Sequence, residues 1–225
     1  MIDLLTGFGL QLSIGICLIG LLVRGVIYIR GLNWQLDRVA YTAHPKAGFK
    51  GAIRSIFFWL LPFATRGWRV QPGMTLLFFV FHIGIIGIFL FLSAHTIIFQ
   101  KTFGISLAVL PALAADVLAW GAVISAFFLA VRRMVMPEVR IMTTASDYMI
   151  LMLSAAPLVT GLICRYEPAG YSFWLIAHML SGEILLIAIP FTRLSHILLF
   201  FLSRAQLGMD FGIKRGGMKG KGMAW

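Results

Sequence analysis

Four histidines stand inside apolar stretches of this sequence, where side chains that bind metals or carry protons are unusual. His82 and His95 lie in FHIGIIGIFLFLSAH, and His178 and His196 lie in HMLSGEILLIAIPFTRLSH. Polar groups inside a bilayer are costly, so such residues usually face the interior of a helix bundle and mark a functional site. The four imidazoles therefore indicate metal ligation or proton transfer.

The elements that must position these histidines are long apolar helices. Of the 225 residues, 60% are hydrophobic and 12% are charged, whereas soluble domains carry about 25% charged residues. Runs of about 20 apolar residues can cross a bilayer as helices. Such runs occur at about 4–29, 73–98, 112–131, 147–164 and 173–200. The sequence predicts an all-α integral membrane protein, with a single membrane domain over residues 1–225 built as a five-helix transmembrane bundle.

Basic residues are concentrated between the first and second runs, between the third and fourth runs, and from Arg193 onward. These segments carry sixteen of the nineteen lysines and arginines, whereas the two opposite loops hold only Lys101 and Arg165. Because positively charged loops stay in the cytoplasm, we expect the N-terminus outside and the C-terminus in the cytoplasm. The expected location is the cell inner (cytoplasmic) membrane.

The basic segments are long enough to contact lipid or a partner. The cytoplasmic loop 31–72 contains His44 and the stretch KAGFKGAIRSIFFWLL, whose basic residues recur every four positions beside an apolar face. This pattern is typical of a helix that lies on the membrane surface, and Pro62 would end it. Residues 204–225 form a basic cytoplasmic tail. The charge agrees with anionic lipid contact or with docking of an acidic cytoplasmic subunit, and it indicates no nucleic acid.

The spacing of the four histidines predicts two levels of paired imidazoles. The 18 residues from His178 to His196 make five turns, so both rings leave the fifth helix on one face. The 13 residues from His82 to His95 leave those rings about 140° apart on an ideal helix. Because the second and fifth helices run antiparallel, His82 lies level with His196 near the inside, and His95 with His178 near the outside. Two facing imidazoles at two depths suit two six-coordinate b-type haems better than tetrahedral zinc.

Less specific interpretations of the same residues stay open. Some of the histidines could serve only as hydrogen-bonding groups between helices. Gly84, Gly87 and Gly182 would let a porphyrin approach, and they also agree with tight helix packing. Cys17 and Cys164 belong to no CxxC motif, so neither an iron–sulfur cluster nor a covalently attached haem is indicated.

The stretches FHIGIIGIF, RRMVMPEVRIMTTASD and HMLSGEILLIAIPFTRLSH resemble the di-haem cytochrome b (gamma) subunit of respiratory nitrate reductase. They also resemble the related membrane cytochromes in the transmembrane redox complexes of sulfate reducers. The resemblance covers about residues 75–200. It implies five helices, two haems b ligated by His82, His95, His178 and His196, a quinol site near the outer haem, and electron exchange with a cytoplasmic iron–sulfur subunit.

Three features depart from the nitrate reductase subunit. Leu92, ten residues after His82, stands where that subunit has a histidine, and His95 follows three positions later. The lysine that the subunit offers to quinone near the start of its third helix has no evident match. The loop 31–72 is also long. These departures favour the sulfate-reducer relatives.

Further polar residues lie within or beside the apolar runs. Glu183 is a candidate proton carrier or quinone ligand, or else a neutral acid that is hydrogen-bonded between helices. Asp116 could accept a quinol proton, although a solvated acid at a helix start is the simpler interpretation. Arg193 could pair with a haem propionate or extend to the membrane interface. Ser146 and Asp147 are expected to cap the fourth helix.

These observations together predict a membrane cytochrome b, the electron-transfer subunit of an oxidoreductase complex. Two b haems would relay electrons across the membrane between (mena)quinone or a periplasmic cytochrome c and a cytoplasmic iron–sulfur subunit. The contrasting prediction is a non-haem membrane anchor or a proton-carrying transporter subunit. The two differ in whether the purified chain carries a b-type spectrum.

Overall fold

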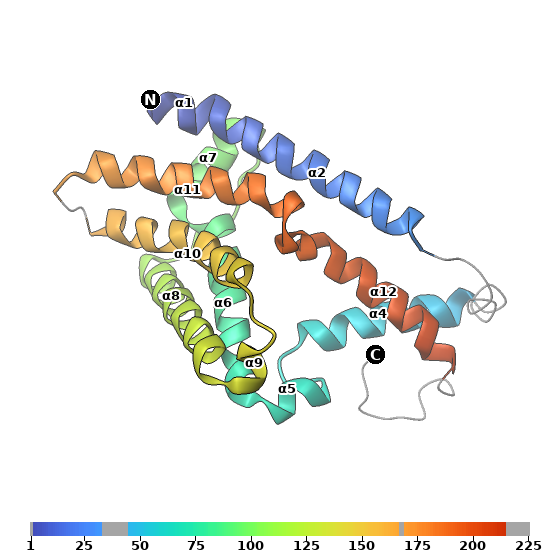
Figure 1. The fold of residues 1–225 in the computed structure, drawn as a ribbon. Helices are drawn as coiled ribbons and strands as arrows, with labels where there is room; N and C mark the ends of the chain where they lie inside the picture. The colour runs from blue at the N-terminus through green and yellow to red at the C-terminus, as the bar shows by residue number, and fades with distance from the viewer. Residues whose placement is uncertain (1, 33–44, 167–168, 215–225) are drawn as a thin grey trace. The chain divides into compact units, whose positions relative to one another are not determined.

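The computed structural model describes residues 2–32, 45–166 and 169–214, with only the backbone for residues 211–214, and within these ranges it contains helices and no strands (Figure 1). His44 and residues 215–225 of the predicted tail lie outside the described residues, whereas residues 204–214 of that tail belong to the last helix, α12. In chain order the helical segments are α1 (Ile2–Leu4), the π-helical η1 (Leu5–Gly9), α2 (Leu10–Arg30), α4 (Pro45–Leu60), α5 (Arg66–Val70), α6 (Pro72–Phe91), α7 (Ser93–Phe103), α8 (Ala112–Val135), α9 (Pro137–Arg140), α10 (Ala145–Arg165), α11 (Tyr171–Phe191), the 3₁₀ turn η2 (Arg193–Ser195) and α12 (His196–Lys214).

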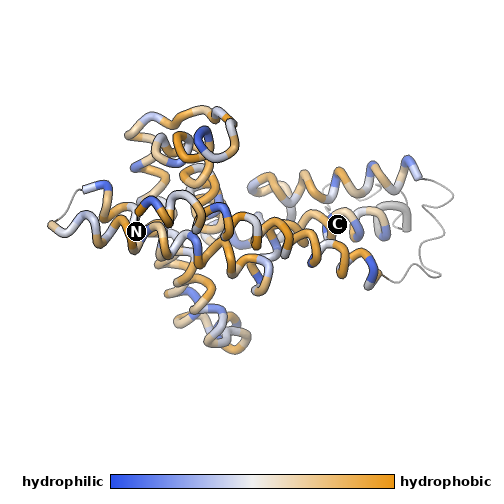
Figure 2. The backbone as a smooth tube through the Cα atoms, turned by 90° about the horizontal axis from the view of Figure 1, so that it is seen from above, coloured by the Kyte–Doolittle hydropathy of each residue, from blue (hydrophilic) through white to orange (hydrophobic). Residues whose placement is uncertain are grey.

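Five helical stretches in the described part of the chain are long and apolar enough to cross a membrane. They are Ile2–Arg30, Pro72–Phe91, Ala112–Val135, Ala145–Arg165 and Tyr171–Phe191. Figure 2 shows that hydrophobic residues dominate the backbone tube along these helices. Large apolar side chains also point outward, since Leu22, Phe127 and Phe173 are 66%, 63% and 67% exposed. Such a surface suits lipid rather than water, so the prediction of an all-α, multi-pass membrane protein is confirmed.

The helices form two compact units where the sequence predicts a single membrane domain. The first contains residues 2–18 and 77–192, and the second contains residues 19–76 and 193–214 of the described chain. The first unit includes η1, most of α6, and α7, α8, α10 and α11. The second includes most of α2, together with α4, α5 and α12.

The first unit has its apolar core where α6, α8 and α10 meet. Phe81 and Ile88 of α6, Ala122 of α8 and Leu158 of α10 are buried in one cluster. Gly84 lets α6 and α8 approach closely, because a Cβ atom at this position would lie 2.7 Å from both the Ala122 Cβ and the Leu118 carbonyl oxygen. Gly84 therefore serves the tight helix packing that small residues permit in membranes.

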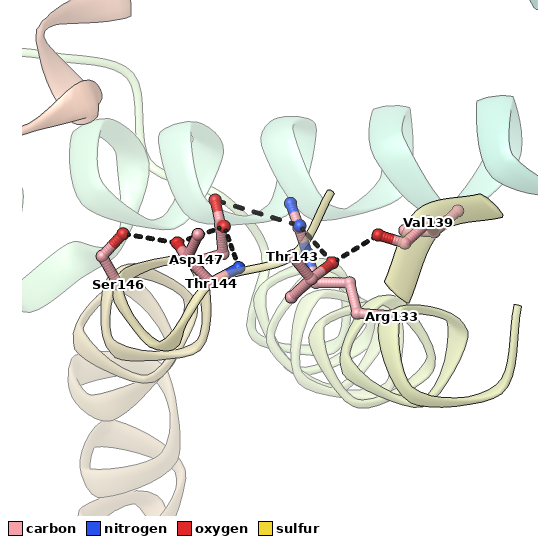
Figure 3. A network of polar contacts seen from close by, with 6 residues as sticks. All are labelled: Arg133, Val139, Thr143, Thr144, Ser146 and Asp147. Atoms are coloured by element: carbon pink, nitrogen blue, oxygen red, sulfur yellow. Dashed lines mark hydrogen bonds and ion pairs between the residues drawn. The ribbon is translucent and has the colours of Figure 1, made fainter. Parts of the chain in front are cut away.

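A polar network fixes the turn between α8 and α10 in the first unit (Figure 3). Thr144 is the N-cap of α10 and forms a capping box with Asp147, whose carboxylate accepts the Thr144 backbone N–H at 2.8 Å. Arg133, near the end of α8, lies 3.9 Å from the same carboxylate and donates to the Thr143 hydroxyl at 3.4 Å. The predicted capping role of Asp147 is confirmed, with Thr144 as the cap and Ser146 hydrogen-bonded to its hydroxyl at 2.8 Å.

In the second unit, α4 packs along α12 through small residues. The buried residues of α4 are Gly48, Ala52 and Ser55. Gly208 of α12 lies directly against the Gly51 backbone, where a Cβ atom would not fit. Small residues spaced four apart let helix backbones touch in this way. The sequence indicates the amphipathic helix and its end before Pro62, but not the pairing of α4 with α12.

Aromatic residues also contribute to the contacts between α4 and α12. The Arg204 guanidinium lies 4.6 Å from the centre of the Trp59 ring, in cation–π geometry. Burial lowers the pKa of this guanidinium from its ordinary value. Trp59 also packs edge-on against Trp68, with ring centres 5.4 Å apart. Phe49 and Phe57, on the apolar face of α4, are 67% and 59% exposed, so this face of the helix is available to lipid.

Candidate functional site

The helix that contains His82 ends before His95, so the prediction of one continuous helix over residues 73–98 is wrong. The helix α6 ends at Phe91, Leu92 has extended backbone angles (φ −68°, ψ 136°), and α7 begins at Ser93. The predicted 140° offset between the two rings therefore does not apply. The Ile88 carbonyl accepts the Leu92 backbone N–H at 3.1 Å, and it also accepts a second hydrogen bond from the Nδ1 of His95 at 3.0 Å.

His178 lies in the middle of α11 and is held by α10. Its Nδ1 donates to the Pro157 carbonyl at 2.9 Å and lies 3.4 Å from the Thr160 hydroxyl. Gly161 leaves room for the ring, since a Cβ atom there would lie 3.1 Å from the Cε1 of His178. The sequence analysis singled out no residue of α10 in this region. The signal that could have found them is Pro157, Thr160 and Gly161 in succession within one apolar helix.

The imidazoles of His95 and His178 lie together in the first unit. Their ring centres are 5.9 Å apart and their planes differ by 3°. The sequence analysis expected these two rings to lie together, but from a continuous helix 73–98 that the structure does not have. Each ring is instead oriented by a local feature that the sequence pattern did not show. The break at Leu92 orients His95, and α10 orients His178.

The His95 and His178 pair fits the donor set of a bis-imidazole metal group. A carbonyl oxygen can only accept, so each Nδ1 carries the proton and each Nε2 keeps the lone pair that binds metals. Bonds from a metal to imidazole nitrogen are about 2 Å long, which puts two rings on opposite sides of one ion roughly 6 Å apart, centre to centre. No group of three or more His, Cys, Asp or Glu suitable for a metal occurs in the described part of the chain. A haem iron can use two imidazole nitrogens of this kind as its protein ligands.

His82 and His196 belong to different units. His82, in α6, donates from Nδ1 to the Phe78 carbonyl at 2.8 Å, and its ring packs on the Phe78 ring with centres 4.1 Å apart. His196 begins α12, and its Nδ1 donates to the Arg193 carbonyl at 3.0 Å. Both residues thus keep the same tautomer as the other two, while their predicted pairing stays a prediction from the sequence. So does the role of Arg193, which lies exposed in η2.

The predicted run 173–200 is also interrupted, so the expectation that His178 and His196 leave one helix on the same face is wrong. The helix α11 ends at Phe191, Thr192 is extended (φ −121°, ψ −175°), and a 3₁₀ turn precedes α12. Pro190 has no N–H to donate. The helical hydrogen bond from residue 190 to the Leu186 carbonyl is therefore missing. At the helix end, the Thr192 hydroxyl donates to the Ala188 carbonyl at 2.9 Å.

Glu183 points at the π-helical turn near the start of the chain. A Cβ atom on Gly9 would lie 2.8 Å from the Oε1 of Glu183, so the carboxyl group packs on the Gly9 backbone. This Oε1 is buried and has no hydrogen-bond partner within the described residues. The alternative prediction of a glutamic acid that is hydrogen-bonded between helices finds no partner for this oxygen among the described residues. Turns of π-helix occur often at functional sites.

Asp116, the other candidate proton acceptor, is engaged in an ion pair. The Nε of Arg165 lies 3.0 Å from its Oδ1, and the Nη2 of Arg165 lies 3.3 Å from its Oδ2. Beside this pair, the Trp120 indole donates to the Tyr166 hydroxyl at 3.0 Å. Both contacts join the start of α8 to the end of α10. The arrangement gives Asp116 a structural role between these helices.

Comparisons with known proteins identify a full-length relative. No family model matches the chain, and no solved structure matches it. A protein of Nitratidesulfovibrio vulgaris (strain Hildenborough) is 50% identical to the chain over 222 residues, which are 98% of each of the two sequences. At this identity and coverage, the chain belongs to the same family as that protein.

Proposed function

We propose that the chain is a membrane cytochrome b subunit that relays electrons across the membrane through two b haems. The observation that carries this proposal is the His95 and His178 pair. Two imidazoles come from two different helices of an apolar bundle, lie 5.9 Å apart between ring centres, and both have Nδ1 fixed by a backbone carbonyl. In metal-binding histidines, the ring nitrogen that does not bind the metal usually donates such a hydrogen bond, which orients the ring.

In this proposal, the chain's own residues bind and orient the cofactor. His95 and His178 would hold the outer haem through Nε2, and His82 and His196 are the proposed ligands of the inner one. Haem b, when bound, supplies the one-electron redox chemistry. The identity of the axial ligands and their hydrogen bonds set its reduction potential. The electron donors or acceptors would be (mena)quinone or a periplasmic cytochrome c outside and an iron–sulfur subunit inside.

The charge distribution supports a cytoplasmic partner and the proposed orientation. Three basic residues lie at the α8–α10 turn, namely Arg132, Arg133 and Arg140. The only basic residue at the opposite ends of α8 and α10 is Arg165, whose charge is paired with Asp116. Because basic loops stay in the cytoplasm, this turn would face the cytoplasm in the cell inner membrane. An acidic face of an iron–sulfur subunit would complement it.

A difference spectrum of the purified chain tests the proposal. Reduction with dithionite should produce a b-type α band, and haem extraction should give about two haems per chain. The variants His95→Ala and His178→Ala should each lower that content by one haem. Cys17→Ser is a matched control, because no ligand role falls on this residue. A wild-type chain that is folded and haem-free would refute the proposal.

The carboxyl group of Glu183 favours a second candidate function, a non-haem subunit that carries protons. Its Oε1 is buried against Gly9 and lacks a hydrogen-bond partner within the described residues, and carboxyl groups inside membranes commonly serve proton transfer. Reconstituted vesicles would then show proton uptake that Glu183→Gln abolishes, with no b-type band. Haem-dependent electron transfer without such uptake would exclude this candidate.

A further inference from the structure

The helix α10 has no histidine, yet three of its residues surround the His178 ring. The Pro157 carbonyl accepts the Nδ1 proton at 2.9 Å, the Thr160 hydroxyl lies 3.4 Å from the same nitrogen, and Gly161 faces the ring edge. All three lie within about one helical turn of one another. These three residues of α10 therefore form the contact surface for the ring, and we call this surface the His178 seat.

The Gly161 position sets the size of this seat. A Cβ atom there would lie 3.1 Å from the Cε1 and 3.2 Å from the Nδ1 of His178. Carbon atoms pack best at about 3.5–4.0 Å, so any larger residue must push the ring away from α10. The same displacement would stretch the hydrogen bond to the Pro157 carbonyl, because both contacts involve Nδ1.

The Thr160 hydroxyl connects the seat to the backbone of α11. It donates to the Ala156 carbonyl at 2.7 Å and lies 3.4 Å from the Ser181 hydroxyl. Ser181 in turn donates to the backbone carbonyl of His178 at 2.9 Å. The Thr160 hydroxyl thus lies beside both the imidazole of His178 and the Ser181 hydroxyl, which holds the backbone carbonyl of His178.

We propose that Gly161 and Thr160 are positioning residues for His178, and that α10 thereby tunes the outer haem. The inference rests on the proposed function. A hydrogen bond from Nδ1 to a carbonyl increases the basicity of the ligand nitrogen and fixes the ring orientation. A more basic ligand favours oxidised iron, so loss of the bond should raise the reduction potential of that haem. Loss of such outer contacts typically weakens metal binding by about 10-fold to 100-fold.

Redox titration of the purified full chain tests this inference. In Gly161→Ala, the outer haem should titrate at a higher potential and dissociate about 10-fold to 100-fold more readily, while the inner haem stays unchanged. Gly15→Ala is the matched control, since no atom lies within 4 Å of a Cβ at that helix position. If Gly161→Ala leaves both potentials and the haem content as in the wild type, the inference is overturned.

Two additions keep the test decisive. Thr160→Val removes the hydroxyl at nearly constant volume, so it should shift the same potential even if Gly161→Ala does not fold; an unchanged potential in Thr160→Val would then overturn the inference. Nitrogen-15 NMR of labelled histidine in the haem-free chain should show His178 protonated on Nδ1 in the wild type and perturbed in Gly161→Ala. This measurement requires no haem, so it supports or overturns the seat independently. A folded wild-type chain without haem would refute the proposed function alone.

Discussion

The replacement Gly84→Ala should loosen the contact between α6 and α8 and destabilise the first unit. The added Cβ would lie 2.7 Å from the Ala122 Cβ and from the Leu118 carbonyl oxygen, whereas nonbonded carbon atoms prefer about 3.5–4.0 Å. The two helices must therefore separate by about 0.8 Å or more. Ala122 is fully buried, and one of the two contacts is backbone, so no flexible side chain can give way.

The matched control is Gly87→Ala, one turn further along α6, where a Cβ would meet only the end of the Leu118 side chain at 3.4 Å. Both replacements gain about 1 kcal/mol of helix propensity, which cancels when the two variants are compared. Overpacking costs about 1–3 kcal/mol. We therefore expect Gly84→Ala to be about 1–3 kcal/mol less stable than Gly87→Ala.

Equilibrium unfolding in detergent micelles, by stepwise addition of SDS and followed by circular dichroism, measures this difference. Both variants keep His82, the proposed inner-haem ligand on α6, so the comparison between them should give the same sign before and after haem extraction. Equal stability of the two variants would refute the assignment of Gly84 to close helix packing and would reopen the interpretation in which it makes room for a porphyrin.

Three further predictions concern the polar residues. His95→Ala and His178→Ala should lose the same component of the b-type α band. Loss of different components by the two variants would show that the two histidines do not ligate the same haem. Glu183→Gln should slow reduction of the haems by a menaquinol analogue several-fold in stopped-flow measurements while the haem content stays at the wild-type level; an unchanged rate would leave Glu183 with a packing role only. Asp116→Asn should destabilise the chain by about 0.2–1 kcal/mol, since the ion pair with Arg165 is partly exposed, and a double-mutant cycle with Arg165→Gln that shows no coupling energy would contradict this.

The sequence by itself determined the fold class. Five long apolar runs must be helices in a membrane because every backbone N–H and C=O in lipid needs a partner within its own segment. The capping by Asp147 was equally readable, because a helix start followed by an acidic N3 residue is a local pattern. For the same reason, the end of α4 before Pro62 follows from residues next to each other in the chain.

The helix ends at Phe91 and Phe191 could not be predicted from neighbouring residues in this way. Hydropathy alone gives one continuous run through Leu92, where no charged residue interrupts it, and another through Thr192, where only Arg193 does. At both helix ends, a side chain that follows the helix hydrogen-bonds to a carbonyl of the last helical turn. The His95 imidazole takes the Ile88 carbonyl, and the Thr192 hydroxyl takes the Ala188 carbonyl.

Only the tertiary structure decided how the candidate site is built. The sequence pattern picks out His95 and His178 because imidazoles are rare in lipid, but it gives no information about their neighbours on another helix. The seat formed by Thr160 and Gly161 depends on how closely α10 approaches α11, and the contact of Glu183 depends on where η1 packs. Such distances follow from the packing of whole helices against one another, which no short stretch of sequence specifies.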